Sequence, residues 1–103
     1  MLSDLVQALN ATSLRFAHFG WSKAPNGDFG VYAEEGLNML RGSNVSGERA
    51  VRVSIDWYTR NPSSSAPGDI EAALDGIPCA WYLNSVLLEE DTGYIHYEWV
   101  AEV

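Results

Sequence analysis

The segment Val51–Tyr58 constrains the fold most strongly. Its apolar residues Val51, Val53, Ile55 and Trp57 alternate with Arg52, Ser54, Asp56 and Tyr58. Successive side chains of a β-strand point to opposite faces of a sheet, so this alternation is typical of a strand that buries one face and exposes the other. The chain therefore needs a sheet with one covered face, and the cover has to come from elsewhere in its 103 residues.

The sequence before this segment predicts a helix and two strands. Leu2, Leu5, Val6 and Leu9 fall at helical spacing and predict a short amphipathic helix that ends within residues 10–13. Residues 14–19 and 29–33 are apolar enough for two strands. The turn residues 25–28 between them predict that the two strands form a hairpin with a long loop.

The sequence after it predicts a second helix and a terminal hairpin. Residues 61–68 are rich in proline and serine and are predicted to be a linker. A short helix then starts at Asp69 and stops at Gly76. Strands over Cys79–Leu88 and Tyr94–Val103 are joined by a polar turn, residues 89–93, which predicts an antiparallel pair.

The order of these elements favours an α+β fold. Runs of strands joined by turns predict a mainly antiparallel sheet of about five strands, with two short helices packed on one face. The length is that of a single domain, residues 1–103. A sheet covered on one face leaves its other face partly bare, and a bare face can meet a neighbouring protein.

The charge of the chain excludes several classes of partner. Fourteen acidic residues against six basic ones give a formal net charge of −8. This charge repels phosphate, so we expect neither sequence-specific nucleic-acid binding nor attachment to an anionic membrane. The single cysteine, Cys79, cannot form an internal disulfide, and no apolar leader with a cleavage site is visible, which predicts a cytoplasmic protein or a component of an assembled particle.

No residue pattern predicts a catalytic, cofactor or metal site. His18, His96 and Cys79 could converge on a metal, but their spacing does not match known ligand pairs. Glycine spacings for phosphate or dinucleotide loops and a serine nucleophile elbow are absent from the sequence. The paired acids are predicted to form an acidic solvated surface, and they are Glu34, Glu35, Glu89, Glu90 and Asp91.

Two groups of residues are candidates for a protein interface. Leu37, Met39 and Leu40 are apolar in a segment broken by glycines, which favours an exposed partner site. Tyr94 and His96 lie on the face of the last strand opposite Trp99. They have two interpretations: a surface buried on assembly, or aromatic residues that stabilise the sheet through cross-strand contacts.

Several segments, taken in order, carry a resemblance to a known family. They are Leu5–Thr12, Phe16-Ala17-His18-Phe19, Ala24-Pro25, Val31-Tyr32, Asn38-Met39-Leu40 with Asn44-Val45, Val53–Thr59, Ile70–Leu74 and Gly93–Val103. Together they resemble the small tail-completion or tail-terminator proteins of long-tailed bacteriophages. The resemblance spans nearly the whole chain.

This resemblance implies a structural protein of the virion and no enzyme. It implies a ring, a hexamer, at the head-proximal end of the tail tube, assembled in the cytoplasm of the host bacterium. Its partners would be itself, the tail-tube protein and the head-side connector protein. Such a ring stops growth of the tube and joins the tail to the head.

Two other functions remain open from the residues. The acidic charge also suits a binding module, such as an inhibitor or immunity protein that masks a basic partner. A small enzyme that uses His18 or His96 is the third alternative. The dependence on salt distinguishes the ring protein from the acidic binding module. A complex held by charge weakens steeply with ionic strength, whereas apolar contacts in a ring persist.

Overall fold

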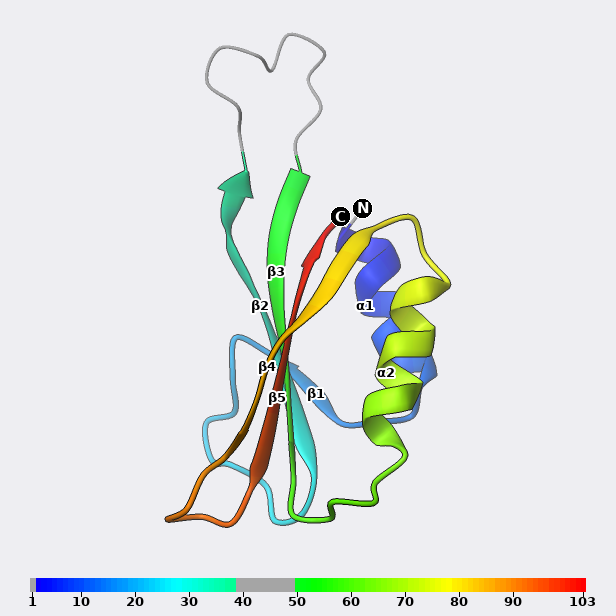
Figure 1. Cartoon of the computed structure of the whole chain (residues 1–103). Helices are drawn as coiled ribbons and strands as arrows, with labels where there is room; N and C mark the ends of the chain where they lie inside the picture. Colours follow the sequence, from blue (N-terminus) through cyan, green and yellow to red (C-terminus); the bar gives the residue numbers. More distant parts are fainter. Residues whose placement is uncertain (1, 39–49) are drawn as a thin grey trace, which may run out of the picture.

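The structure is a computed structural model that describes residues 2–38 and 50–103, with the backbone alone for residues 36–38 and 50 (Figure 1). Seven elements follow one another along the chain. They are α1 (Leu2–Ala11), β1 (Phe16–His18), β2 (Phe29–Asn38), β3 (Ala50–Thr59), α2 (Ala66–Asp75), β4 (Ala80–Leu88) and β5 (Ile95–Glu102).

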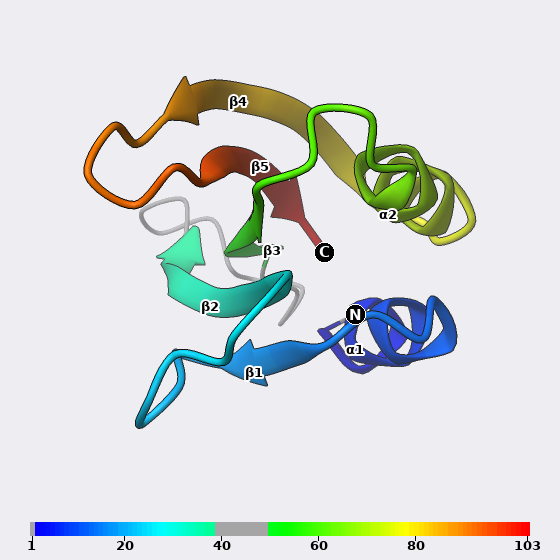
Figure 2. The same ribbon diagram turned by 90° about the horizontal axis from the view of Figure 1, so that it is seen from below.

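The strands form one sheet in the order β1-β2-β3-β5-β4. The pairs β2–β3, β3–β5 and β4–β5 are antiparallel, and β1–β2 is parallel. Both helices lie on the same face of the sheet, as Figures 1 and 2 show. The predicted α+β fold, a mainly antiparallel sheet with two helices on one face, is confirmed.

The core lies between the two helices and the middle strands. The alternation in β3 has the predicted facing, because Val53, Ile55 and Trp57 are buried. Trp99 and Ala101 of β5 are buried on the same face, as predicted. The helices cover this face with apolar residues at helical spacing, which are Leu5 and Leu9 of α1 and Ala66, Ile70 and Leu74 of α2.

The two core tryptophans differ in how their indole N–H groups are satisfied. Trp99 Nε1 donates a hydrogen bond to Glu71 Oε2 at 2.9 Å, which ties β5 to α2. Trp57 Nε1 is buried and has no hydrogen-bond partner in the described part of the structure. A hydrogen bond to a carboxylate contributes about 1.5–3 kcal/mol, and an unpaired buried donor costs free energy.

We therefore expect Trp99→Phe to destabilise the fold more than Trp57→Phe. Both changes remove a similar volume, but the first leaves Glu71 without its donor and the second removes an unpaired donor. The difference in the free energy of unfolding should be about 1–3 kcal/mol in urea titrations. Equal losses for the two variants would mean that the Trp99–Glu71 bond contributes nothing net.

The predicted hairpin between residues 14–19 and 29–33 is wrong, because β1 and β2 run parallel. The chain reverses twice between them. It turns once at Phe19 and Gly20, which have φ of 68° and 146°, and again at Gly27, with φ of 84°. The Arg15 side chain donates to the carbonyl oxygens of Asn26 and Asp28, so the loop returns to the start of β1 before β2 begins.

The second helix begins three residues earlier than predicted, at Ala66. Pro67 lies in its first turn, where a helix makes no use of the missing N–H. The preceding segment is ordered by short-range bonds, from Ser63 N to Asn61 Oδ1 and from Ala66 N to Ser64 Oγ. The predicted terminal hairpin is confirmed, with β4 and β5 antiparallel around residues 89–94.

Candidate protein–protein interface

Strand β4 forms one end of the sheet, and among the described residues its sole strand partner is β5. Leu87 and Leu88 are 60% and 65% exposed. The whole strand contains no charged residue. Natural edge strands usually carry charges or prolines that prevent pairing with another chain. The β4 edge is defined by its exposed large apolar residues, which are Tyr82, Leu83, Val86, Leu87 and Leu88.

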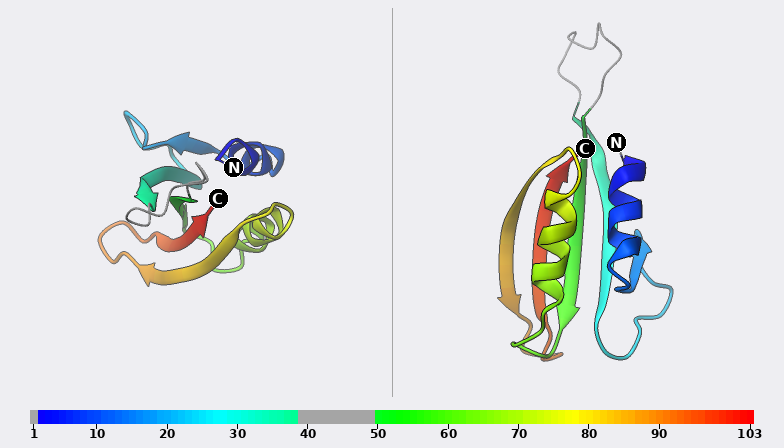
Figure 3. Two further views of the ribbon diagram at one scale, coloured as in Figure 1. Left: turned by 90° about the horizontal axis from the view of Figure 1, so that it is seen from above. Right: turned by 90° about the vertical axis from the view of Figure 1, so that its right-hand side faces the viewer.

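Both faces of β4 carry apolar side chains. These side chains are exposed because neither helix covers most of the strand. Leu83 and Val86 pair with Trp99 and Tyr97 on the helix side of the sheet, and Leu87 pairs with His96 on the other side. The end of α2 reaches the start of the strand, where Trp81 Nε1 donates to Asp75 Oδ1 at 2.9 Å. From this point the strand runs away from α2, as the left-hand view of Figure 3 shows.

A β-bulge interrupts β4 between Leu83 and Ser85. The Asn84 amide at the bulge donates from Nδ2 to Glu98 Oε1 at 2.8 Å. A bulge increases the local twist of a strand and re-aims its side chains. The bulge therefore divides the exposed apolar residues of the edge into two groups. Tyr82 and Leu83 precede it, and Val86, Leu87 and Leu88 follow it.

A second apolar site lies at the opposite end of the sheet, beside β1. Phe19, directly after the strand, is 67% exposed, and Trp21 is also exposed. Trp21 Nε1 donates to Gly30 O at 3.0 Å, which fixes this part of the loop against β2. Phe19 and Trp21 together with β1 define the β1 edge. Among the described residues, every exposed large apolar side chain belongs to the β4 edge or the β1 edge.

The apolar loop proposed from the sequence is only partly described. Met39 and Leu40 lie outside the described residues. The backbone of Leu37 belongs to β2 and pairs with Val51 of β3, and its side chain lies outside the described part. The interface at these three residues therefore stays a prediction.

Tyr94 is buried within the single chain, at 8% exposure. Its hydroxyl donates to Gly27 O at 2.9 Å, which links the residue before β5 to the turn before β2. Its ring meets Phe29 edge-on at 5.5 Å, and the Arg60 guanidinium lies 3.9 Å from the ring centroid. These contacts leave Tyr94 little surface for a partner protein.

His96 makes cross-strand contacts on the face away from the helices. Its ring stacks on Tyr58 at 4.2 Å, Nε2 bonds Asp56 Oδ1 at 2.7 Å, and Nδ1 lies 3.4 Å from Glu89 Oε2. The hydrogen bond to Asp56 raises the pKa of His96, and burial opposes this effect without cancelling it. Burial also raises the pKa of Tyr58 to about 12. The sheet-stabilising interpretation therefore accounts for both Tyr94 and His96.

The raised pKa of His96 predicts a pH-dependent stability. The folded state binds the imidazole proton more tightly than the unfolded state, so the stabilisation is complete below the ordinary pKa of 6.5. It is lost as pH rises through the folded pKa. We expect the free energy of unfolding to fall in the wild type as pH rises above the ordinary pKa of 6.5, and to fall by less in His96→Gln and Asp56→Asn. An NMR titration that places the His96 pKa at or below 6.5 would contradict this expectation.

The predicted acidic surface is partly paired. Glu34 bonds His18, and this hydrogen bond lowers the pKa of the Glu34 carboxyl. Glu89 contacts His96. Glu35, Glu90 and Asp91 are exposed, and the last two lie in the turn that follows the β4 edge. Three of the five predicted acidic residues, Glu89, Glu90 and Asp91, therefore lie directly after the end of β4.

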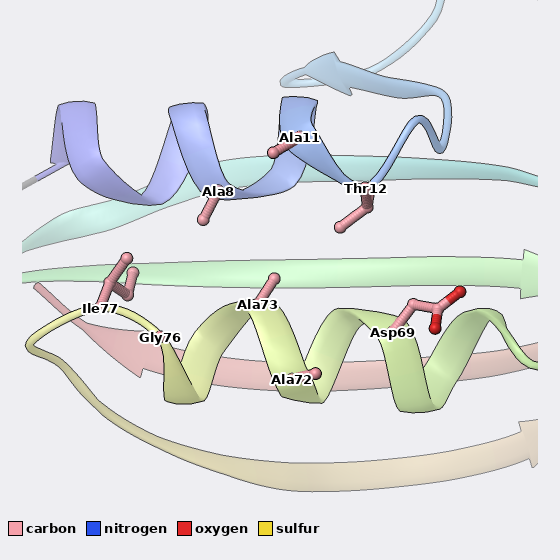
Figure 4. A pocket seen from close by; sticks show the side chains of 8 residues that line it. All are labelled: Ala8, Ala11, Thr12, Asp69, Ala72, Ala73, Gly76 and Ile77. Atoms are coloured by element: carbon pink, nitrogen blue, oxygen red, sulfur yellow. The ribbon is translucent and has the colours of Figure 1, made fainter.

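An open groove of ≈ 610 Å³ lies between α1 and α2 (Figure 4). Small side chains from the two helices line it, and Asp69 is the one charged residue among them. His18, His96 and Cys79 do not converge, because they bond Glu34, Asp56 and the Leu74 carbonyl oxygen. Among residues 2–38 and 50–103, no three His, Cys, Asp or Glu side chains are arranged to hold a metal ion.

The sequence interpretation missed the two sheet edges. The run Cys79–Leu88 predicts a strand, and its lack of charged residues is the signal that could have indicated an interface. Neither described helix is long and apolar enough to cross a membrane. No protein-family model matches the chain. A search of curated proteins also gave no match.

Proposed function

We propose that the protein is a structural subunit that assembles with copies of itself into a ring. We further propose that the ring is the tail terminator of a long-tailed bacteriophage, bound to the tail-tube protein and the head-side connector protein. The resemblance along the chain supports the second statement. The two apolar sheet edges support the first.

The observation that carries this proposal is the uncharged β4 edge in a chain with a net charge of −8. Exposed apolar surface is unfavourable in water, and a concentrated patch marks a protein interface. Copies of an acidic protein repel one another, so an uncharged apolar surface favours their self-association. Strand β4 has both properties.

The mechanism is geometric and involves no reaction. A contact between two different surfaces of the same subunit closes into a ring when the rotation between neighbours sums to a full turn. Such a ring at the end of a tube covers the surface on which the next tube subunit would bind. Its acidic charge gives no counterion-release drive for DNA binding, so passing DNA would not be held.

The test uses the tail-tube protein of the virus that carries this gene. Tubes polymerised with the wild-type protein should be capped at one end by a ring in electron micrographs, and should be shorter than tubes grown alone. The Leu87→Lys variant serves as the control and should leave the tubes uncapped. Uncapped tubes of unchanged length, from a protein that itself forms rings, would contradict the tail-terminator function.

Ionic strength separates this function from an acidic inhibitor. Ring assembly through apolar contacts should persist in high salt, because ions screen charges and do not weaken apolar burial. A monomer that instead forms a one-to-one complex with a basic protein, and loses it in salt, would favour the inhibitor.

A further inference from the structure

We propose that the two sheet edges bind each other, so that the β4 edge of one copy contacts the β1 edge of the next. This inference rests on the self-assembly part of the proposed function. It adds which two surfaces meet and that the copies are arranged head to tail. The occupant of each edge is a second copy of this chain, placed head to tail.

The first argument is the position of the two edges. They lie at opposite ends of the strand order, as the right-hand view of Figure 3 shows. When two different surfaces of one subunit are complementary, each copy has one free surface left after pairing. The result is a ring or a filament, whereas two β4 edges that bind each other would stop at a dimer.

The second argument is charge complementarity between the edges. Residues 14–27 contain Arg15 and Lys23 and no acidic residue, in a chain with a net charge of −8. Residues 80–93 contain Glu89, Glu90 and Asp91 and no basic residue. A head-to-tail contact brings opposite charges to the rim of an apolar patch, which favours this pairing over contact between two β4 edges.

The third argument is the backbone of Phe19. Its φ of 68° lies in the left-handed region, where a bulky residue is uncommon and strained. The ring is 67% exposed and stacks on His18 at 4.2 Å. Asparagine or glycine adopts this conformation at lower cost. A strained backbone at an exposed aromatic residue is explained if contact with a second copy buries the phenyl group of Phe19.

The experiment uses one variant for each edge. Leu87→Lys places on β4 a residue that natural edge strands use against pairing, and it opposes Arg15 and Lys23 of the next copy. Phe19→Asn removes the exposed ring and keeps a side chain suited to the left-handed backbone. Each variant alone should be monomeric by native mass spectrometry and sedimentation. A mixture of the two should form a one-to-one heterodimer and nothing larger, because one intact contact remains.

Matched controls separate the interface from the fold. Gln7→Lys adds the same charge on an exposed position of α1, and Ser13→Asn changes another exposed residue with positive φ, 65°. Both should assemble as the wild type does. The melting midpoint of monomeric Phe19→Asn should not fall below that of monomeric Leu87→Lys.

The other outcomes overturn the inference. If Phe19→Asn assembles normally while Leu87→Lys does not, the β4 edge binds something other than the β1 edge. A mixture that is no heavier than its components over a rising concentration series also contradicts head-to-tail pairing. Wild-type protein that stays monomeric would contradict the self-assembly on which the inference rests. Rings that form but do not cap tubes would contradict the tail-terminator function alone and would not contradict the edge-to-edge contact.

Discussion

Replacing Leu87 and Leu88 together with lysine is expected to leave a folded monomer that does not assemble. Both side chains are more than half exposed in the single chain, so their loss costs the monomer little. Burial of a leucine contributes about 1.5–3 kcal/mol, so each contact between copies should weaken by about 3 kcal/mol or more, which is a factor above about one hundred. Light scattering measures the mass, and circular dichroism confirms the fold.

The matching change at the loop predicted from the sequence is Met39→Asp with Leu40→Asp. The sequence-based interface predicts that this change also abolishes the ring and leaves the monomer folded. A ring that survives the loop change and is lost in the β4 change would assign the contact to the sheet edge. A ring that survives the β4 change would show that this edge is not an interface.

Trp57→Ala is expected to cost about 3–5 kcal/mol of the free energy of unfolding. Trp57 is 2% exposed, lies near the C-terminal end of β3, and its ring meets that of Phe16 at 5.5 Å between centroids. Removing the indole leaves a cavity in the hydrophobic core. Because domains of this size are stable by about 5–15 kcal/mol, the variant should melt at a much lower denaturant concentration.

Trp57→Phe is the control for this change, since it keeps an aromatic ring in the core and removes the unpaired N–H. It should lose much less stability than the alanine variant. A loss under about 1 kcal/mol for Trp57→Ala would mean that the side chain is not buried as described.

The central strands could be predicted because their side chains repeat with the period of a strand. Val53, Ile55 and Trp57 are buried on one face, as their spacing indicates. The same applies to α1, whose Leu5 and Leu9 are buried. Local pattern determines facing in such elements, because one face must leave water.

The parallel pairing of β1 could not be predicted in this way. The turn residues before β2 are present and do form a turn, with Gly27 at φ 84°. Another reversal occurs at Phe19 and Gly20. Phenylalanine seldom takes positive φ, so the glycine alone indicates a turn there. The Arg15 side chain bonds two carbonyl oxygens of this loop, those of Asn26 and Asp28, and contacts over such a sequence separation have no local signature.

The candidate interface shows the same limit. A run such as Ala80–Leu88, apolar on both faces, is typical of a strand buried on both sides. The topology places it at the end of the sheet, beyond the cover of the helices, and strand order is not visible in a local pattern. Tyr94 and His96 were candidates because their residue types suit an interface, but their partners within the chain come from β2 and β3 and the turns beside them.

The most direct test of the account is the mass of the wild-type protein in solution over a concentration series at low and high salt. A chain whose two apolar edges are completed by its own copies should reach one fixed subunit number, and should hold it in high salt. Protein that remains monomeric at every concentration, with the β4 edge still exposed to water, would contradict the account.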